Sequence, residues 1–257
     1  MILCVIENID TSKNLISSAA QLAIQLGKTF GIVFKININN SESANYKNEV
    51  SLLLDNLNLE PDIIQIESSN TFDLVDFCES NDISFLFLQL INIKSKTIQN
   101  YLSTCRELRI PYLFFKVNFD ELDLEKIILP VNFLAEELEK AQFASAFGRF
   151  CDSEVLILQA NDYGSKAETN VMKMIALFEK FSFKFSVEKA KKDSFSVDKE
   201  AVQHAEISNA GLIIISASRE YGLDDIIFGP KELHLIKKSG IPLLIVNPRA
   251  DLYTLCD

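Results

Sequence analysis

GLIIISASREYGLDDIIFGPKELHLIKKSG, residues 211–240, reads as a buried strand followed by a long loop and then a helix. Its uninterrupted apolar run, Leu212 to Ile215, is too short for a helix and predicts a buried strand. The glycines that follow indicate a loop. Pro230 stands at the expected first position of a helix, which two lysines and Gly240 would end. In an open α/β sheet, such a junction between strand and helix is where ligands usually bind.

Short apolar runs alternate with amphipathic helical segments along the whole chain. Strands are expected at 2–7, 29–37, 62–67, 84–90, 111–116, 127–132, 153–159, 182–188, 212–215 and 242–247. Helices are expected between them, among them 71–79, 95–108, 134–149, 165–180 and 196–208. On the helix at 134–149, small residues form a stripe that predicts close packing. Strands that alternate with helices over short links predict parallel sheets covered by helices on both faces.

The second half of the chain repeats the first. IILPVN at 127–132 corresponds to ILCVIE at 2–7, SNAGLIIIS at 208–216 corresponds to SNDISFLFL at 80–88, and GIPLLIV at 240–246 corresponds to RIPYLFF at 109–115. We therefore expect two tandem α/β domains, residues 1–118 and 123–257, each with a five-stranded parallel sheet. Each domain ends in a strongly apolar strand, and pairing the two terminal strands about a pseudo-twofold axis would cover both edges.

Composition limits the kinds of partner. With 36 acidic against 25 basic residues the net charge is −11, which disfavours binding to nucleic acid or to an anionic membrane. The N-terminal apolar run is too short for a signal-peptide core or a membrane span, so a cytoplasmic location is expected. Five cysteines without a CxxC pair indicate reduced thiols and no zinc site. The expected partners are an unidentified protein and a second copy of the chain.

The repeated unit resembles the universal stress protein domain, here in tandem over nearly the whole chain. The resemblance rests on IILPVNF at 127–133, on the segment 216–246, and on the last strand of each repeat, which begins with Ile-Pro. It implies a Rossmann-like fold for each half. In that family, the members that bind nucleotides carry the pattern G-x2-G-x9-G-[ST] after the fourth strand and an Asp after the first strand.

The second repeat departs from that pattern at its functional positions. Ser216 and Arg219 stand in place of the first two glycines, Pro230 stands in place of Ser or Thr, and Asn132 stands at the Asp position. Added Cβ atoms obstruct the convergence of N–H groups on a phosphate, and proline removes one N–H. Asn132 is expected to cap the following helix. The candidate, degenerate nucleotide cleft comprises Val131, Asn132, Ser216, Ala217, Arg219, Gly222, Gly229 and Pro230.

The first repeat is further from the pattern. It keeps a carboxylate, Glu7, after its first strand, but no glycine lies between Ile91 and Tyr101. We expect it to serve as a structural partner for the second repeat.

No dinucleotide-binding, Walker A or GxSxG motif occurs, and the two histidines lie in different predicted helices, so no catalytic or metal site is expected. The sequence predicts a non-enzymatic stress-response or regulatory protein that requires no cofactor and does not bind ATP. The alternative is an adenine-nucleotide sensor or slow ATPase that binds ATP or AMP in the cleft of the second repeat. A third hypothesis is that the cleft accepts a different small ligand, because Arg219 and Pro230 reshape it.

Overall fold

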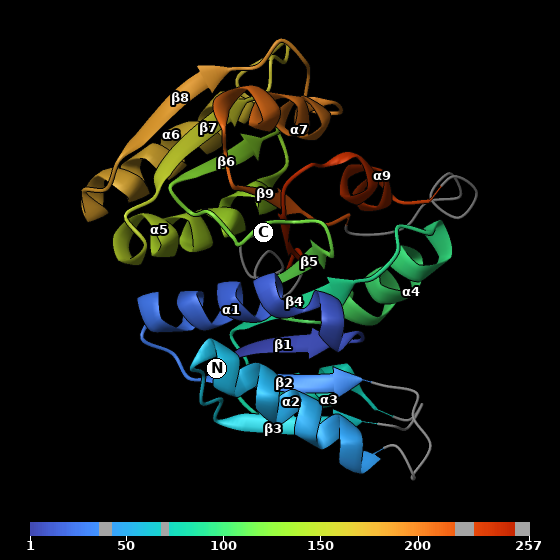
Figure 1. Ribbon diagram of the computed structural model, residues 1–257. Coiled ribbons are helices and arrows are strands. Elements are labelled where there is room, and N and C mark those ends of the chain that lie inside the picture. Colours follow the sequence, from blue (N-terminus) through green and yellow to red (C-terminus); the bar gives the residue numbers. More distant parts are fainter. Residues whose placement is uncertain (36–42, 68–71, 219–228, 250–257) are drawn as a thin grey trace. The chain divides into compact units, whose positions relative to one another are not determined.

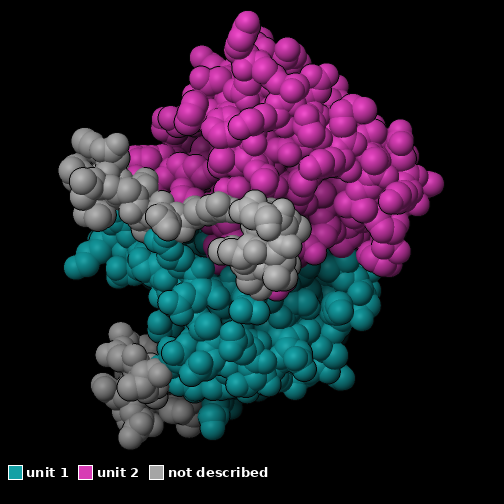
Figure 2. Space-filling view, turned by 180° about the vertical axis from the view of Figure 1, so that it is seen from behind, with its two compact units in different colours: residues 1–122 teal, residues 123–257 magenta. Residues whose placement is uncertain are grey.

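The computed structural model describes residues 1–35, 43–67, 72–218 and 229–249. The chain divides into two compact units, Met1–Leu122 and Asp123–Asp257 (Figure 2). Within the described ranges, no helix has both the length and the apolar character needed to cross a bilayer.

Unit 1 alternates strands and helices as the apolar runs predict (Figure 1). Its elements are β1 (Ile2–Ile6), η1 (Ile9–Thr11), α1 (Lys13–Gln25), β2 (Phe30–Lys35), α2 (Ser43–Leu57), β3 (Ile63–Glu67), α3 (Leu74–Ser80), β4 (Phe85–Leu90), α4 (Ser95–Cys105) and β5 (Tyr112–Lys116). The strands are parallel in the order β3-β2-β1-β4-β5. Because parallel crossovers are right-handed, this order places α1 and α2 on one face of the sheet and α3 and α4 on the other.

Unit 2 repeats this arrangement. Its elements are β6 (Lys126–Val131), η2 (Ala135–Glu139), α5 (Lys140–Phe150), β7 (Glu154–Gln159), α6 (Lys166–Phe181), β8 (Phe185–Lys189), α7 (Val197–Ser208), β9 (Leu212–Ser216), α9 (Lys231–Lys238) and β10 (Leu243–Val246). The strands are parallel in the order β10-β9-β6-β7-β8. Helices α5 and α6 contact each other, as do α7 and α9, in agreement with one pair of helices on each face.

Burial follows position in each sheet. Strands β1, β4, β5, β9 and β10 are buried along their whole length, whereas β3 and β8, each at the other end of its unit's strand order, are largely half-buried or exposed. A strand covered by helices on both faces reads as a continuous apolar run, and this explains why the buried strands are the clearest in the sequence. The apolar core of each unit therefore lies away from β3 and β8.

Two helices differ from the sequence prediction. The helix expected at 134–149 is divided into the 3-10 segment η2 and the α-helix α5. The proline predicted at the first position of the last helix is instead its N-cap: Pro230 has an extended backbone, with φ −66° and ψ 160°, and α9 begins at Lys231. The preceding Gly229 has φ +82°, a conformation that glycine adopts without strain, so this glycine has a backbone role that requires no phosphate.

Candidate functional site

In unit 2 the sheet opens where β6 and β9 diverge. These neighbouring strands pair at Ile127–Leu212 and Ile128–Ile213, and β6 then continues to pair with β7 as far as Val131. Pro130 has no N–H to offer to a neighbouring strand, and its carbonyl accepts a hydrogen bond from the Lys140 ammonium. From β6 the chain continues to α5 on one face of the sheet, and from β9 it continues to α9 on the other face. In α/β sheets, ligands bind between two strand ends of this kind.

A cavity of about 640 Å³ lies at these strand ends. It is lined by Asn132, Phe133, Leu134, Glu136, Ser194, Phe195, Asp198, Ser216, Ala217, Ser218 and Lys231. A second cavity, of about 670 Å³, shares Phe133 and Phe195 with the first and extends along residues 161–166. We refer to the first as the unit 2 cavity. Its volume is in the usual range for small-molecule sites, roughly 300–1,000 Å³.

The structure places the predicted cleft residues in three groups. Asn132, Ser216 and Ala217 line the unit 2 cavity. Val131 is buried inside β6, where its carbonyl accepts from the Ala160 N–H, while Gly229 and Pro230 are buried just before α9; these three residues are not among the lining residues. The other two predicted positions, Arg219 and Gly222, lie outside the described residues.

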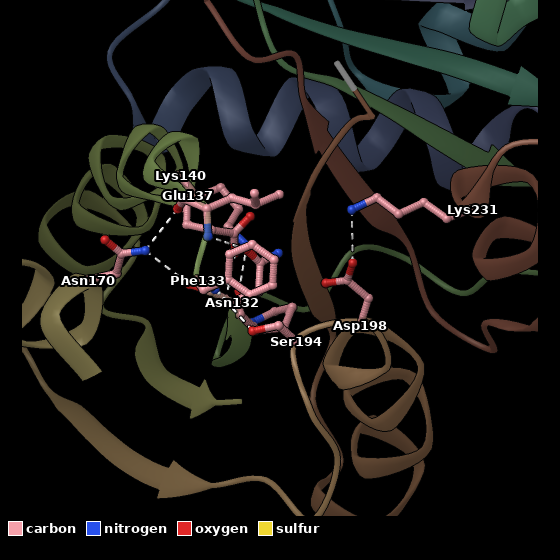
Figure 3. A network of polar contacts seen from close by, with 10 residues as sticks. Asn132, Phe133, Glu137, Lys140, Asn170, Ser194, Asp198 and Lys231 are labelled. Carbon is pink, nitrogen blue, oxygen red and sulfur yellow. Dashed lines mark hydrogen bonds and ion pairs between the residues drawn. The ribbon is translucent and has the colours of Figure 1, made fainter. Parts of the chain in front are cut away.

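A buried ion pair holds the end of β6 (Figure 3). Lys140 Nζ lies 2.7 Å from Glu137 Oε2, and the two side chains are 0% and 1% exposed. The same carboxylate oxygen accepts from the Asn132 N–H at 3.2 Å. Since Lys140 also donates to the Pro130 carbonyl, η2 and α5 fix the backbone on which the cavity is built.

Asn132 stabilises a turn and does not cap the following helix, so that prediction is wrong. Its Oδ1 accepts from the Leu134 N–H at 2.7 Å, and Leu134 is the N-cap of η2. The side-chain amide of Asn170, on α6, donates to the carbonyls of Asn132 and Leu134 at 3.0 and 2.8 Å. Asn132, which stands where nucleotide-binding universal stress proteins carry Asp, is thus bonded to other groups of this chain.

A second set of hydrogen bonds joins the loops beside the cavity. Ser194 Oγ accepts from the Phe133 N–H at 3.0 Å and donates to the Asp162 carboxylate, which also accepts from the Ser194 N–H at 2.8 Å. Phe133 and Phe195 meet edge to face, with ring centroids 5.7 Å apart. These contacts fix an aromatic wall formed by residues that the sequence analysis did not single out.

The opposite wall carries charge. Lys231 Nζ, at the first position of α9, lies 3.1 Å from Asp198 Oδ2 on α7. Burial by itself would lower the pKa of Lys231, but the carboxylates of Asp198, Glu232 and Glu137 outweigh burial and raise that pKa above its ordinary value. The local field is therefore negative.

Behind this wall, the Glu232 carboxylate bonds to a backbone N–H that a bound phosphate would otherwise use. Glu232 is fully buried, and its carboxylate accepts a hydrogen bond from the Ser218 N–H, the second backbone donor after β9. The first, Ala217 N–H, donates to the Val246 carbonyl at 2.8 Å. The N–H groups of Ala217 and Ser218 are thus bonded to acceptors of the chain itself, and neither is directed to the cavity.

The corresponding junction of unit 1 is closed by one buried side chain. The Gln89 amide oxygen accepts from the N–H groups of Glu7 and Asn8 at 2.8 and 2.7 Å, and its nitrogen donates to the Asn8 carbonyl and to Thr11. The Glu7 carboxylate accepts from the Tyr101 hydroxyl, and burial together with that carboxylate raises the pKa of Tyr101. Glu7, the carboxylate expected from the sequence, is therefore held by protein partners.

Asp198, Lys231 and Phe195 are the main residues that the sequence analysis missed. Asp198 and Phe195 come from the segment between β8 and α7, which no motif marks. A usable signal was topological: residues that follow the carboxyl end of any strand in the sheet gather at the same edge. Within the described part of the chain, no group of three or more His, Cys, Asp or Glu side chains is arranged to hold a metal ion.

Comparison with known proteins gives matches to solved structures alone, since no family model and no curated protein sequence matches the chain. A universal stress protein from Archaeoglobus fulgidus is 17% identical over 97% of both chains, with a TM-score of 0.69. A putative universal stress protein from Pseudomonas aeruginosa is 12% identical over 96% of this chain and 92% of that chain, with a TM-score of 0.59. Along nearly its whole length, the chain has the universal stress protein fold.

Proposed function

We propose that the chain is a non-enzymatic stress-response or regulatory protein of the universal stress protein type, acting in the cytoplasm, and that its unit 2 cavity does not bind ATP. The observation that carries the proposal is the hydrogen bond between the Glu232 carboxylate and the Ser218 N–H. A phosphate at this junction would need that backbone donor, which already has a buried anionic partner.

Charge supports the same conclusion. Asp198 pairs with Lys231, a lysine among the described residues that line the unit 2 cavity, and the buried Glu232 lies behind the wall. A triphosphate would enter a negative field and would have to compete with Asp198 for that lysine. Pro230 at the N-cap of α9 removes a further N–H from the approach.

The absence of an enzymatic role is proposed from the residues that line the cavity. They include Ser194, Ser216 and Ser218, but neither histidine. Ser194 donates to Asp162, a carboxylate fixed by two hydrogen bonds, and His204 lies 3.1 Å from Glu188 and is not among the lining residues. A serine nucleophile is ordinarily activated by a histidine within hydrogen-bond reach, and no histidine is among the described residues that line the cavity.

The test is to extract the purified chain and identify any co-purified nucleotide by chromatography, followed by calorimetric titration with Mg-ATP and AMP. We expect no stoichiometric nucleotide and no saturable heat. Stoichiometric ATP or AMP, or a micromolar dissociation constant for either, would contradict the proposal. A Glu232→Gln variant, which keeps an acceptor for Ser218 without the charge, shows how far the carboxylate itself excludes the anion.

An adenine-nucleotide sensor is the second candidate function. The position of the cavity at the diverging ends of β6 and β9 and its volume of about 640 Å³ favour this function. The same titration decides between the two functions, because a sensor must bind ATP or AMP reversibly at physiological concentrations.

A further inference from the structure

The unit 2 cavity contains buried hydrogen-bond acceptors that lack a donor. Asp198 is 8% exposed; its Oδ2 accepts from Lys231, whereas its Oδ1 has no hydrogen-bond partner among the described residues. In Figure 3 the free oxygen points away from Lys231, toward the side of the cavity formed by Asn132 and Phe133. Ser216, 4% exposed at the end of β9, also has a hydroxyl without a partner in the described structure. Buried polar atoms are normally satisfied, so the Asp198 oxygen indicates a missing donor, and the Ser216 hydroxyl indicates a missing partner from which it can accept or to which it can donate.

The field in the cavity favours a donor that carries positive charge. The charged lining residues are Glu136, Asp198 and Lys231, and the buried Glu232 adds negative charge behind them, whereas the charge of Glu137 is paired with that of Lys140. The raised pKa of Lys231 reports the same excess of negative charge. An ammonium group would satisfy Asp198 Oδ1 by a charge-assisted hydrogen bond, which is stronger than a neutral one.

The aromatic wall gives such a ligand an apolar surface. Phe195 is 81% exposed although it lies beside a charged cavity, and it packs edge to face with Phe133. Ser194 and Asp162 fix the backbone that carries both rings, so little ordering is needed when a ligand packs against them. The rings also offer π faces to a cation.

We propose that the unit 2 cavity binds a small organic cation, with its ammonium group on Asp198 and Ser216 and its apolar body against Phe133 and Phe195. The inference goes beyond the proposed function and rests on its premise that ATP does not occupy the cavity. The volume of about 640 Å³ admits an amine with one or two rings.

The experiment uses three probes with one indole body and different charge: tryptamine, tryptophol and indole-3-acetate. Titration of the full chain at low ionic strength is expected to show saturable binding of tryptamine, with the neutral alcohol and the anion each weaker by about tenfold or more. Added salt should weaken tryptamine binding. Equal or tighter binding of tryptophol, or no saturable binding of tryptamine at millimolar concentration, overturns the proposal.

Variants locate the site. Asp198→Asn should weaken tryptamine binding by about tenfold or more, and Phe195→Ala, a change at an exposed side chain, should weaken it severalfold. Glu206→Gln is the matched control, because Glu206 lies on the exposed side of the same helix and is not a lining residue. An equal loss in Glu206→Gln overturns the assignment. If Asp198→Asn does not fold, Phe195→Ala and the three-probe series still decide, and the separate ATP titration shows independently whether the proposed function fails.

Discussion

At the level of single residues, the buried ion pair of Lys140 and Glu137 is expected to have a large effect on stability. Replacing Lys140 by Met would leave the Glu137 carboxylate charged, buried and without its 2.7 Å partner. We expect Lys140→Met to lower the free energy of unfolding by about 3–5 kcal/mol, measured by urea denaturation. The double variant Glu137→Gln/Lys140→Met should recover part of the loss, because the Gln oxygen still accepts from the Asn132 N–H without a charge.

Lys173 provides the control for that measurement. It is exposed on α6 in the same unit, so Lys173→Met should change the free energy of unfolding by less than about 0.5 kcal/mol. A loss below about 1 kcal/mol for Lys140→Met would mean that the pair does not hold β6 in the way described.

The thiol of Cys151 should react slowly in the native chain. Burial raises its pKa from 9.0 to about 11, so at pH 8 only about one thiol in a thousand is ionised. The alkylation rate should therefore rise steeply between pH 8 and pH 11. Because the neutral thiol is favoured in the folded state, its contribution to stability is complete below pH 9 and is lost as pH rises toward 11.

Mass spectrometry after iodoacetamide treatment checks this pH profile. The Cys256→Ser variant is the suitable background, because Cys256 lies outside the described residues. Rapid modification of Cys151 at pH 8, at the rate of a free peptide thiol, would contradict the prediction. Cys4 and Cys105, fully buried with raised pKa values, should react only on unfolding.

At the scale of elements, helix α5 requires a glycine where it packs against Phe183. A Cβ added at Gly148 would lie 2.4 Å from the Phe183 ring. Gly to Ala ordinarily stabilises a helix by about 1 kcal/mol. Here we expect Gly148→Ala to destabilise the chain by about 1–3 kcal/mol, because the clash outweighs helix propensity. Gly240→Ala is the matched control, since a Cβ at Gly240 meets no atom within 4 Å. Thermal unfolding that is unchanged or raised in Gly148→Ala would disprove the packing argument.

The elements themselves were predictable, because buried parallel strands read as apolar runs. The strands expected at 2–7, 84–90 and 153–159 are β1, β4 and β7, within one residue at each end. The division of the helix at 134–149 was not predictable. It depends on Asn132 and Asn170 bonding the turn and on Lys140 reaching back to Glu137, contacts between residues that the sequence does not bring together.

The candidate site was predictable in place but not in composition. Asn132 and Ser216 line the unit 2 cavity because they lie at the carboxyl ends of the neighbouring strands β6 and β9, which the repeat indicates. Asp198 and Lys231 come from α7 and α9, and they meet only because those helices cover the same face. Their pairing depends on tertiary packing, so no spacing along the chain reveals it.

At the scale of the whole molecule, net charge determines which large partners are accessible. With a net charge of −11, the chain should repel the phosphate backbone of DNA and RNA. We expect no change in fluorescence anisotropy when labelled duplex DNA or single-stranded RNA is mixed with the chain at about 0.1 M ionic strength. Binding that weakens steeply with added salt would reveal a basic surface that the total charge conceals.

Glu232 has a consequence for what the chain can sense. A carboxylate attached to the backbone is present at the Ser218 N–H at a far higher effective concentration than any freely diffusing nucleotide can reach. The proposed function therefore predicts that the occupancy of that donor does not follow the energy state of the cell. It also predicts that the chain responds to stress through its abundance or its partners, and that this response stays constant while the ratio of ATP to AMP changes.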